Sequence, residues 1–275
     1  MTTFHYPHLN EELAEGYTSP TQRVRVMSEG WVQDNIFCPS CDAKHLKQFE
    51  NNRPVADFYC AECGEEFELK SNRSKIKKKI PGGAYASMIE RLESEARPNL
   101  MLLAYDPDLL DVRELLVVPK QFLVPTIVEK RKPLKDTARR AGWIGCNIHL
   151  ESIPETGRIP YIFEGKAVPP SEVRAQWGKT LFIRNTESAE TKGWLIDVMR
   201  CVDKLGSGEF TLQQVYEFAP ELATLHPDNH HIGAKIRQTL QRLRDNGYIE
   251  FVSRGVYRRG EGRGGGVDQR TPQKV

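Results

Sequence analysis

The chain has 275 residues, of which 39 % are hydrophobic and 28 % charged, and its net charge is +2. This length suffices for two compact domains. No apolar run reaches the roughly 18 residues that a membrane helix needs, and the N-terminus lacks the basic and apolar regions of a signal peptide. We therefore expect a cytoplasmic protein with no membrane partner. In that compartment its six cysteines are expected to be metal ligands or free thiols, not a disulfide framework.

The predicted elements begin with a helix over residues 20–34, for which Ser19 is the N-cap and Pro20 the first helical residue. Paired strands follow, joined by a turn that contains two cysteines. Helices placed between apolar runs of strand length indicate a mixed α/β core. The elements after the first helix are strands at 55–59 and 66–70, a basic loop at 71–83, a helix at 84–96, and strands at 99–106 and 114–120.

A polar stretch at residues 184–193 is the predicted linker, and the pattern beyond it changes to helices. Three helices followed by a β-hairpin are the order of a winged helix. The expected elements are helices at 194–205, 211–218 and 229–245 and a hairpin at 248–259. The expected domains are residues 1–185 and a winged helix at 186–260, followed by a tail at 261–275. We expect the tail to be disordered because it has almost nothing to bury.

Four cysteines form two Cys-x-x-Cys pairs, Cys38 with Cys41 and Cys60 with Cys63, separated by 18 residues. This spacing is typical of a zinc site. Four thiolates complete a tetrahedral shell and leave no position for water or substrate, so we expect a structural Zn²⁺. The alternatives are a redox pair or unrelated buried thiols. The remaining cysteines lack such partners, and we expect ordinary buried residues at Cys146 and Cys201.

A candidate catalytic set lies on the predicted hairpin that holds the second cysteine pair. Glu68 and Lys70 are two residues apart in a strand and project from one face, and Asp57 can join them across the hairpin. Two carboxylates can hold Mg²⁺, while a lysine can orient the attacking water and offset charge on the phosphate. One acid followed by Glu-x-Lys is the pattern of PD-(D/E)xK nucleases. The alternatives are a surface ion pair and a histidine metal site in "HPDNHH" (226–231).

Basic residues cluster in three parts of the chain, and together they can form a face that follows DNA phosphates. The clusters cover residues 71–80, 129–140 and 229–260. After Arg139 and Arg140, a turn of small residues carries Trp143. Its ring can offer an apolar wall to a methyl group in the major groove, while the arginines meet phosphate or guanine. The alternative is a core tryptophan beside solvated arginines.

The third predicted C-terminal helix carries basic and amide side chains beside its apolar stripe. Such side chains suit phosphates and base edges when a recognition helix enters the major groove. A solvated outer face of an ordinary helix is the alternative. The candidate DNA-binding residues are Lys235, Gln238 and Arg242 on one side, Arg237 and Gln241 on another, and Arg254 in the wing.

Several segments resemble the DpnI-type family of methyl-directed restriction endonucleases, and the resemblance covers about residues 20–259. They are "FENNRPVADFYC" (49–60), "EEFELKS" (65–71), "TARRAGWIGCNI" (137–148) and "IRQTLQRLRDNGYIEF" with "RGVYR" near the end. The resemblance implies a PD-(D/E)xK core with a structural zinc, a winged helix, and Mg²⁺-dependent cleavage of double-stranded DNA at GATC sites that carry N6-methyladenine. It implies catalytic positions for Asp57, Glu68 and Lys70 and supports Trp143 as a methyl reader. One departure is that Ala56, not proline, precedes Asp57.

One function and two alternatives follow. We expect a Type II restriction endonuclease that is monomeric in solution, needs no obligate protein partner and contacts methylated double-stranded DNA with both domains. The first alternative is a zinc-containing winged-helix DNA-binding regulator without catalysis, and the acid–acid–lysine set argues against it. The second is a nuclease directed at unmethylated or differently modified sites.

Overall fold

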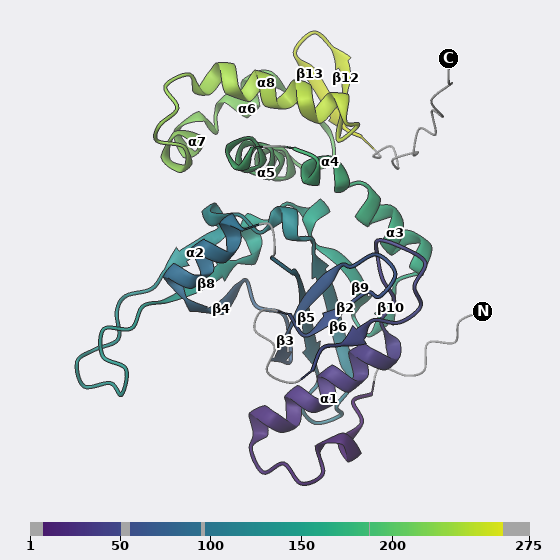
Figure 1. The fold of residues 1–275 in the computed structure, drawn as a ribbon. Coiled ribbons are helices and arrows are strands. Elements are labelled where there is room, and N and C mark those ends of the chain that lie inside the picture. The colour runs from purple at the N-terminus through teal and green to yellow at the C-terminus, as the bar shows by residue number, and fades with distance from the viewer. Residues whose placement is uncertain (1–7, 51–55, 95–96, 187, 261–275) are drawn as a thin grey trace, which may run out of the picture.

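The structure, a computed structural model, describes residues 8–50, 56–94, 97–186 and 188–260 (Figure 1). Its largest element is a seven-stranded mixed sheet, in which β3 and β5 run parallel and all other neighbours run antiparallel. The strand order is β1 (Lys47–Gln48), β2 (Phe58–Tyr59), β3 (Glu66–Arg73), β5 (Asn99–Tyr105), β6 (Val112–Val118), β9 (Ile159–Phe163) and β10 (Lys166–Ala167). The mixed α/β prediction is confirmed. Residue 55 of the predicted strand 55–59 lies outside the described residues.

Both faces of this sheet are covered, and its central strand β5 is buried along its whole length. Leu100 and Leu102 belong to one apolar cluster, and Met101 and Leu103 to another, because side chains alternate along a strand. Helix α1 (Pro20–Asn35) covers the second cluster, and it begins where the sequence predicts. Ser19 occupies the N-cap position of α1, but its side chain makes no capping hydrogen bond.

A second, smaller sheet lies beside the main one and has the order β4–β8–β7. Its strands are β4 (Lys79–Ala84), β8 (Gly145–His149) and β7 (Val128–Lys130). The sequence predicts a loop up to residue 83, and this is wrong for β4, because pairing with β8 satisfies its backbone despite Pro81 and two glycines. A Cβ on Gly82 would lie 2.5 Å from Cys146 Sγ, so this close approach requires glycine.

Helix α2 (Tyr85–Glu93) follows β4 and forms the crossover from β3 to the parallel strand β5. The helix predicted at 84–96 is confirmed over 85–93, whereas Ala84 belongs to β4, Ser94 is extended, and residues 95–96 lie outside the described residues. The other elements before residue 186 are the 3₁₀ turns η1 (Glu11–Ala14), η2 (Lys120–Phe122), η3 (Pro125–Ile127), η4 (Leu150–Ser152) and η5 (Glu155–Gly157) and the helices α3 (Pro170–Gly178) and α4 (Leu181–Arg184).

The C-terminal part has the helix order and hairpin that the sequence predicts, with differences at the helix ends. Its elements are α5 (Ala189–Leu205), β11 (Glu209–Thr211), α6 (Leu212–Tyr216), α7 (Ala219–Leu225), α8 (Ile232–Asp245), β12 (Ile249–Ser253) and β13 (Val256–Arg259). The predicted linker 184–193 is too long, because α5 begins at Ala189, where Ser188 caps it by accepting a hydrogen bond from Thr191 N. Thr211 forms a capping box with Gln214 at the start of α6. Helix α7 is not predicted, and the tail 261–275 lies outside the described residues.

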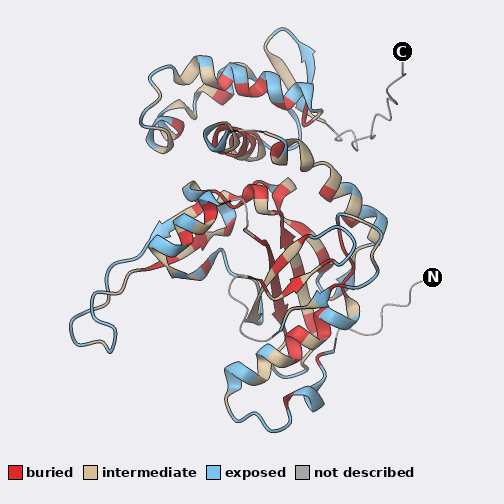
Figure 2. Ribbon diagram, in the orientation of Figure 1, coloured by how far each residue is buried: buried red, intermediate tan, exposed pale blue. Residues whose placement is uncertain are grey.

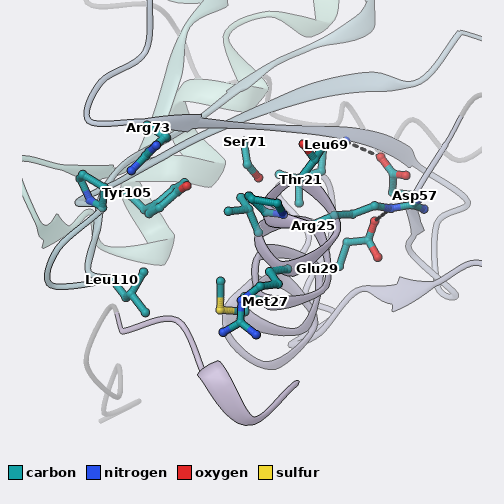
Figure 3. A pocket seen from close by; sticks show the side chains of 14 residues that line it. Thr21, Arg25, Met27, Glu29, Asp57, Leu69, Ser71, Arg73, Tyr105 and Leu110 are labelled. Carbon is teal, nitrogen blue, oxygen red and sulfur yellow. Dashed lines mark hydrogen bonds and ion pairs between the residues drawn. The ribbon is translucent and has the colours of Figure 1, made fainter. Parts of the chain in front are cut away.

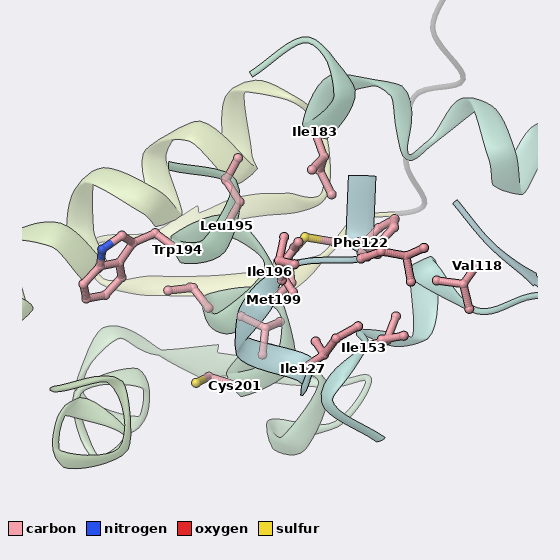
Figure 4. Packing of buried hydrophobic residues seen from close by; sticks show 14 of the residues in the cluster. Val118, Phe122, Ile127, Ile153, Ile183, Trp194, Leu195, Ile196, Met199 and Cys201 are labelled. Carbon is pink, nitrogen blue, oxygen red and sulfur yellow. The ribbon is translucent and has the colours of Figure 1, made fainter. Parts of the chain in front are cut away.

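Helix α5 lies between the β-sheet part and the rest of the C-terminal elements, and it is buried over most of its length (Figure 2). Its apolar side chains share one cluster with residues that precede α3. Figure 4 shows Phe122 and Ile153 near Ile196 and Met199 of α5. The two parts of the chain therefore pack together through a continuous apolar contact. Within the residues that the structure describes, no helix is both long and apolar enough to cross a bilayer.

Candidate functional site

The four candidate zinc ligands converge beside the β2–β3 turn, and their Sγ atoms all lie within 4.8 Å of one another. The Sγ atoms are 3.5 Å apart for Cys38 with Cys63 and for Cys41 with Cys60. A tetrahedral Zn²⁺ with bonds of about 2.3 Å separates its thiolates by roughly 3.8 Å, so the cluster fits this ion. Among the described residues, this is the one cluster of at least three such side chains that could hold a metal ion. Both unpaired cysteines, Cys146 and Cys201, are buried, as expected.

The thiols of this cluster differ in their surroundings. Burial raises the pKa of Cys63 to about 11 and raises the pKa of Cys38 well above its usual value. Burial also acts to raise the pKa of Cys60, but hydrogen bonds from the backbone of Cys63 and Glu62 outweigh it, so that this pKa is lowered. A metal ion that binds here must displace the thiol protons, which makes its affinity depend on pH.

Contacts with other elements fix the cysteine turns in place. Cys60 N donates to Glu65 O, which closes the turn before β3. Arg174 Nε, on α3, donates to Cys41 O at 3.0 Å, and the Tyr161 hydroxyl on β9 donates to Phe37 O at 3.1 Å. The cysteine cluster therefore lies between the β2–β3 hairpin and the elements β9 and α3, which belong to the other end of the main sheet.

Asp57 immediately precedes β2 and is bonded to the neighbouring strand. Its Oδ2 accepts a hydrogen bond from Leu69 N at 2.7 Å, and its own backbone N donates to Phe67 O. Strand β2 contains only Phe58 and Tyr59, so Asp57 lies outside the strand pairing with β3. Its carboxylate, in place of a backbone carbonyl, accepts the hydrogen bond from the β3 backbone. This bond holds the carboxylate beside the one residue that separates Glu68 from Lys70.

Glu68 and Lys70 project from the same face of β3 and are paired. Lys70 Nζ lies 2.8 Å from Glu68 Oε1, and Arg91 Nη1 on α2 lies 3.3 Å from Glu68 Oε2. All three side chains are half-buried, so the pairs are partly screened from water. The sequence does not single out Arg91. The only indication of its position comes from the topology, because a helix that connects β3 to the parallel strand β5 must pass over one face of the sheet near β3.

A pocket on the α1 side of β3 has a volume of about 690 Å³ (Figure 3). Asp57 lies at one end of it with Arg25 and Glu29, and Arg73 and Tyr105 lie at the other. Glu68 instead lines a narrow cleft beside α2. The two candidate metal-binding carboxylates therefore approach Leu69 from different pockets, and they do not line a single pocket.

Sequence reasoning misses the polar group next to Asp57. Arg25 Nε donates to Glu29 Oε1 at 2.6 Å, and Gln48 Nε2 donates to Glu29 Oε2 at 2.8 Å. The hydrogen bond with Glu29 is the main cause that raises the pKa of Arg25, and the charge of Asp57 adds to it. The spacing of Arg25 and Glu29 by four residues on α1 is the sequence signal for this pair.

The chain's donors suit Mg²⁺ in chemistry, since carboxylate oxygens of Asp57 and Glu68 are its preferred type of ligand. Asp57 directly precedes β2 and Glu68 lies on the neighbouring strand β3, and the bond to Leu69 N engages only the Oδ2 oxygen of Asp57. Lys70 and Arg91 offset the charge of Glu68. Asp57 and Glu68 thus supply ligands of the right type on neighbouring parts of the hairpin, although they line different pockets in the structure.

The candidate methyl-reading loop connects β7 to β8 and extends away from the body of the molecule (Figure 1). Arg139 and Arg140 are exposed, and Trp143 is half-buried. The guanidinium of Arg140 lies 4.6 Å from the ring of Trp143. A Cβ on Gly145 would lie 2.7 Å from that ring, so the indole packs directly on this glycine. Trp143 is therefore not a core tryptophan.

The base of this loop is held by an ionic cluster around Glu129 of β7. Its carboxylate accepts hydrogen bonds from Lys79, His149 and Asn147, and the Lys79 bond is the main cause that lowers the pKa of Glu129 to about 2. The basic cluster predicted at 71–80 is thus partly neutralised here. A charged anchor at the base leaves the loop tip free to contact a partner.

Most candidate residues on α8 are accessible. Arg237, Gln238, Gln241 and Arg242 are exposed, and Arg237 Nη1 donates to the Tyr216 hydroxyl at 2.8 Å. Lys235 is half-buried, with its Nζ 3.4 Å from a carboxylate oxygen of Glu190 on α5.

In the wing, Arg254 is exposed at the β12–β13 turn. Arg258 and Arg259 belong to the same predicted basic cluster, but both are paired with acids. Arg258 bonds to Glu250, and Arg259 lies 2.9 Å from Glu155 and 3.5 Å from Asp203. Of the wing arginines, Arg254 is thus the one without an ion pair among the described residues.

The rival histidine site is not formed by the described residues. His226 instead stacks on Trp194, with ring centroids 4.0 Å apart, and its Nε2 lies 3.0 Å from Asp197 Oδ2. His230 and His231 are exposed. The stretch 226–231, which the structure describes in full, therefore connects α7 to α8 and forms no metal cluster.

Two family models match the chain. Residues 5–186 match the DpnI model, described as the Dam-replacing family, and residues 190–259 match the DpnI_C model, described as the Dam-replacing HTH domain. The first match includes the cysteine cluster and the β2–β3 hairpin, and the second includes α8 and the wing. The chain belongs to the DpnI, or Dam-replacing, family of methyl-directed restriction endonucleases, with the helix-turn-helix domain of that family at its C-terminus.

Proposed function

We propose that this chain is a Type II restriction endonuclease that cleaves double-stranded DNA at GATC sites carrying N6-methyladenine, with Mg²⁺ as cofactor. The single observation that carries the proposal is that all three side chains are attached to one strand segment, Glu68 to Lys70. Asp57 is bonded to Leu69 N, and Glu68 and Lys70 flank that residue and pair with each other. Membership in the DpnI family supports the reaction class.

The core of the proposal is a PD-(D/E)xK site in which Asp57 and Glu68 would hold Mg²⁺. When bound, this ion supplies a more acidic water and neutralises charge on the phosphate. Lys70 is the candidate to orient the attacking water and to stabilise the negative charge that develops on the phosphate oxygens. Its pairing with Glu68 keeps the ammonium at the strand face where that work is needed.

The proposed zinc ion acts at a distance from the chemistry. A short polar hairpin is mobile by itself, and a closed four-cysteine site at its turn would hold β2 and β3 in one register. The relative position of Asp57 and Glu68 depends on that register. We propose Zn²⁺ as a structural cofactor for this reason.

DNA recognition is proposed to use both parts of the chain, residues 1–185 and the winged helix at 186–260. The exposed side chains of α8 and the tip of the wing supply phosphate and base contacts. Trp143, with Arg139 and Arg140, supplies a second contact from the β7–β8 loop. Two readers in series would discriminate methylated DNA better than one, because a single methyl contributes only about 0.8 kcal/mol by transfer.

The test is digestion of one plasmid, prepared with and without adenine methylation at GATC, in buffer with Mg²⁺ or with chelator. We expect cutting of the methylated plasmid only, at GATC, and only with the metal. Asp57→Asn is the matched catalytic variant and should bind the same DNA without cutting it. Cutting of both plasmids would keep the nuclease and reject the methyl specificity. DNA binding without cutting by the wild type would favour the winged-helix regulator.

A further inference from the structure

The carboxylate of Glu68 is engaged by a cation on each oxygen. Lys70 Nζ lies 2.8 Å from Oε1, and Arg91 Nη1 lies 3.3 Å from Oε2. The family pattern on this strand accounts for the lysine but leaves the arginine unexplained. Arg91 comes from α2, more than twenty residues later in the chain, and reaches the same carboxylate.

The position of Arg91 on α2 is well fixed. The residues Met88 and Leu92 on the same helix are buried in the apolar cluster that covers this face of the sheet. Arg97 donates to the carbonyls of Leu92 and Ser94 and so closes the end of α2. Among the described residues, Glu68 is the one side chain with which the Arg91 guanidinium forms an ion pair. A guanidinium is thus held beside the proposed metal ligand while remaining partly exposed.

A charge count shows what this arginine can do. Asp57 and Glu68 carry two negative charges, and Lys70 and Arg91 carry two positive charges, so the four groups are neutral together. A divalent cation adds two positive charges, and a bound phosphodiester adds one negative charge. The loaded site, with metal and phosphodiester but before attack, therefore carries one net positive charge when Arg91 is present. Negative charge develops on the phosphate oxygens as the attacking water gives up its proton, and this positive site is matched to that charge.

We propose that Arg91 is a further functional residue of this site, in an inference that rests on the proposed nuclease function. Without metal, Arg91 occupies Glu68 and competes with a divalent cation. When metal and DNA are bound, its guanidinium leaves Glu68 for a non-bridging oxygen of the scissile phosphate, to which it can donate two hydrogen bonds. The arginine thus weakens metal binding to the free enzyme and favours the fully loaded complex.

This role predicts opposite effects on two measurements. Arg91→Gln removes a positive charge next to the cation, so Mn²⁺ should bind the zinc-replete, DNA-free protein on the order of 10-fold more tightly. The same variant loses a donor to the transition state, so single-turnover cleavage of methylated DNA should slow by on the order of 100-fold. Arg91→Lys keeps the charge and should return Mn²⁺ affinity toward that of the wild type, with partial recovery of cleavage.

A matched control is Arg113→Gln, because the Arg113–Asp106 pair has a similar length, 3.2 Å, and similar exposure but lies outside this site. It should change neither Mn²⁺ affinity nor cleavage. Weaker Mn²⁺ binding together with slower cleavage in Arg91→Gln would show a merely structural role and overturn the proposal. Unchanged Mn²⁺ binding would overturn it as well. Failure of the wild type to cut any DNA would instead reject the proposed function, since Mn²⁺ binding is measured without DNA.

Discussion

The carboxylate of Asp57 accepts a 2.7 Å hydrogen bond from the backbone N–H of Leu69, the residue that lies between Glu68 and Lys70. An acid outside the β2 ladder is therefore attached to the middle of the Glu-x-Lys segment through the main chain. The bond needs an acceptor oxygen, which asparagine also has, whereas binding of a divalent cation needs the negative charge.

Asp57→Asn should accordingly separate structure from catalysis. We expect an unchanged melting temperature within a few degrees and loss of cleavage by at least about 100-fold, because the remaining carboxylate holds the cation poorly. The measurement is single-turnover cleavage of methylated plasmid with thermal unfolding in parallel. Asp106→Asn is the control, since the Asp106 carboxylate also accepts backbone hydrogen bonds, from Asp108 and Leu109, but lies outside the candidate site. Cleavage by Asp57→Asn at the wild-type rate would exclude Asp57 from catalysis.

Part of this site follows from local sequence alone. The two-residue period of a strand places Glu68 and Lys70 on one face, and the structure has them paired. The partner that Glu68 has on α2 could not be predicted, because the sequence does not fix which residue of a crossover helix faces a given strand position. The separate pocket of Asp57 was also not predicted, since it depends on where α1 packs.

The four cysteines make a prediction about stability. Cys60→Ser should lower the zinc content from about one ion per chain to near zero and lower the melting temperature by many degrees, because structural zinc contributes its binding free energy to folding. Zinc content by atomic absorption and thermal unfolding are the two measurements. Cys201→Ala is the control, since Cys201 is a buried cysteine on α5, outside the cysteine cluster. This variant should be less stable than the wild type but should keep its zinc. Full zinc content in Cys60→Ser would reject the four-cysteine site.

The fold could be predicted where elements are strongly patterned, as for α1, β5 and β6. The errors occur where tertiary contacts decide. The stretch 184–193 contains polar residues that suit a linker. Its last five residues instead belong to α5, which packs between the β-sheet part and the other C-terminal helices, and Gly193 is buried there. Strand β4 contains Pro81 and two glycines, which argue against a strand locally, and its pairing with β8 overrides them.

Asp203 at the end of α5 makes the junction between the two parts sensitive to pH. Its carboxylate accepts hydrogen bonds from Glu155 N and the Tyr248 hydroxyl. Burial is the largest cause and raises the pKa of Asp203, although these bonds and the charge of Arg259 act to lower it. The folded protein therefore binds this proton more tightly than the unfolded chain does. Proton binding at Asp203 therefore adds to the free energy of unfolding. This contribution is fully present below the unfolded pKa of about 3.9 and is lost as the pH rises through the higher folded pKa.

Asp203→Asn removes this titration, so the melting temperature of the variant relative to wild type should rise between about pH 4 and pH 7. Thermal unfolding across that range measures the difference. Asp106→Asn should stay nearly level over most of this range and change in the opposite direction only at its acidic end, because backbone hydrogen bonds lower the pKa of Asp106 below the unfolded value. A relative melting temperature of Asp203→Asn that falls with rising pH would mean that its hydrogen bonds and the Arg259 pair dominate over burial.

The contact between Trp143 and Gly145 gives a prediction about methyl specificity. The indole rests on the Cα of Gly145 under the guanidinium of Arg140. Trp143→Ala should reduce the preference for methylated over unmethylated DNA by roughly 4-fold per methyl contacted, since one methyl is worth about 0.8 kcal/mol. Gly145→Ala should have a related effect, because its Cβ would displace the ring.

Relative cleavage of methylated, hemimethylated and unmethylated GATC substrates measures this preference, and Trp143→Phe should retain most of it. Arg139→Ala is the matched control in the same loop. An arginine that contacts phosphate contributes to binding of every sequence, so this variant should slow cleavage of all three substrates by the same factor. If Trp143→Ala also slows all three equally, the ring serves to shape the β7–β8 loop, and the methyl group must be recognised elsewhere, with the exposed face of α8 as the next surface to test.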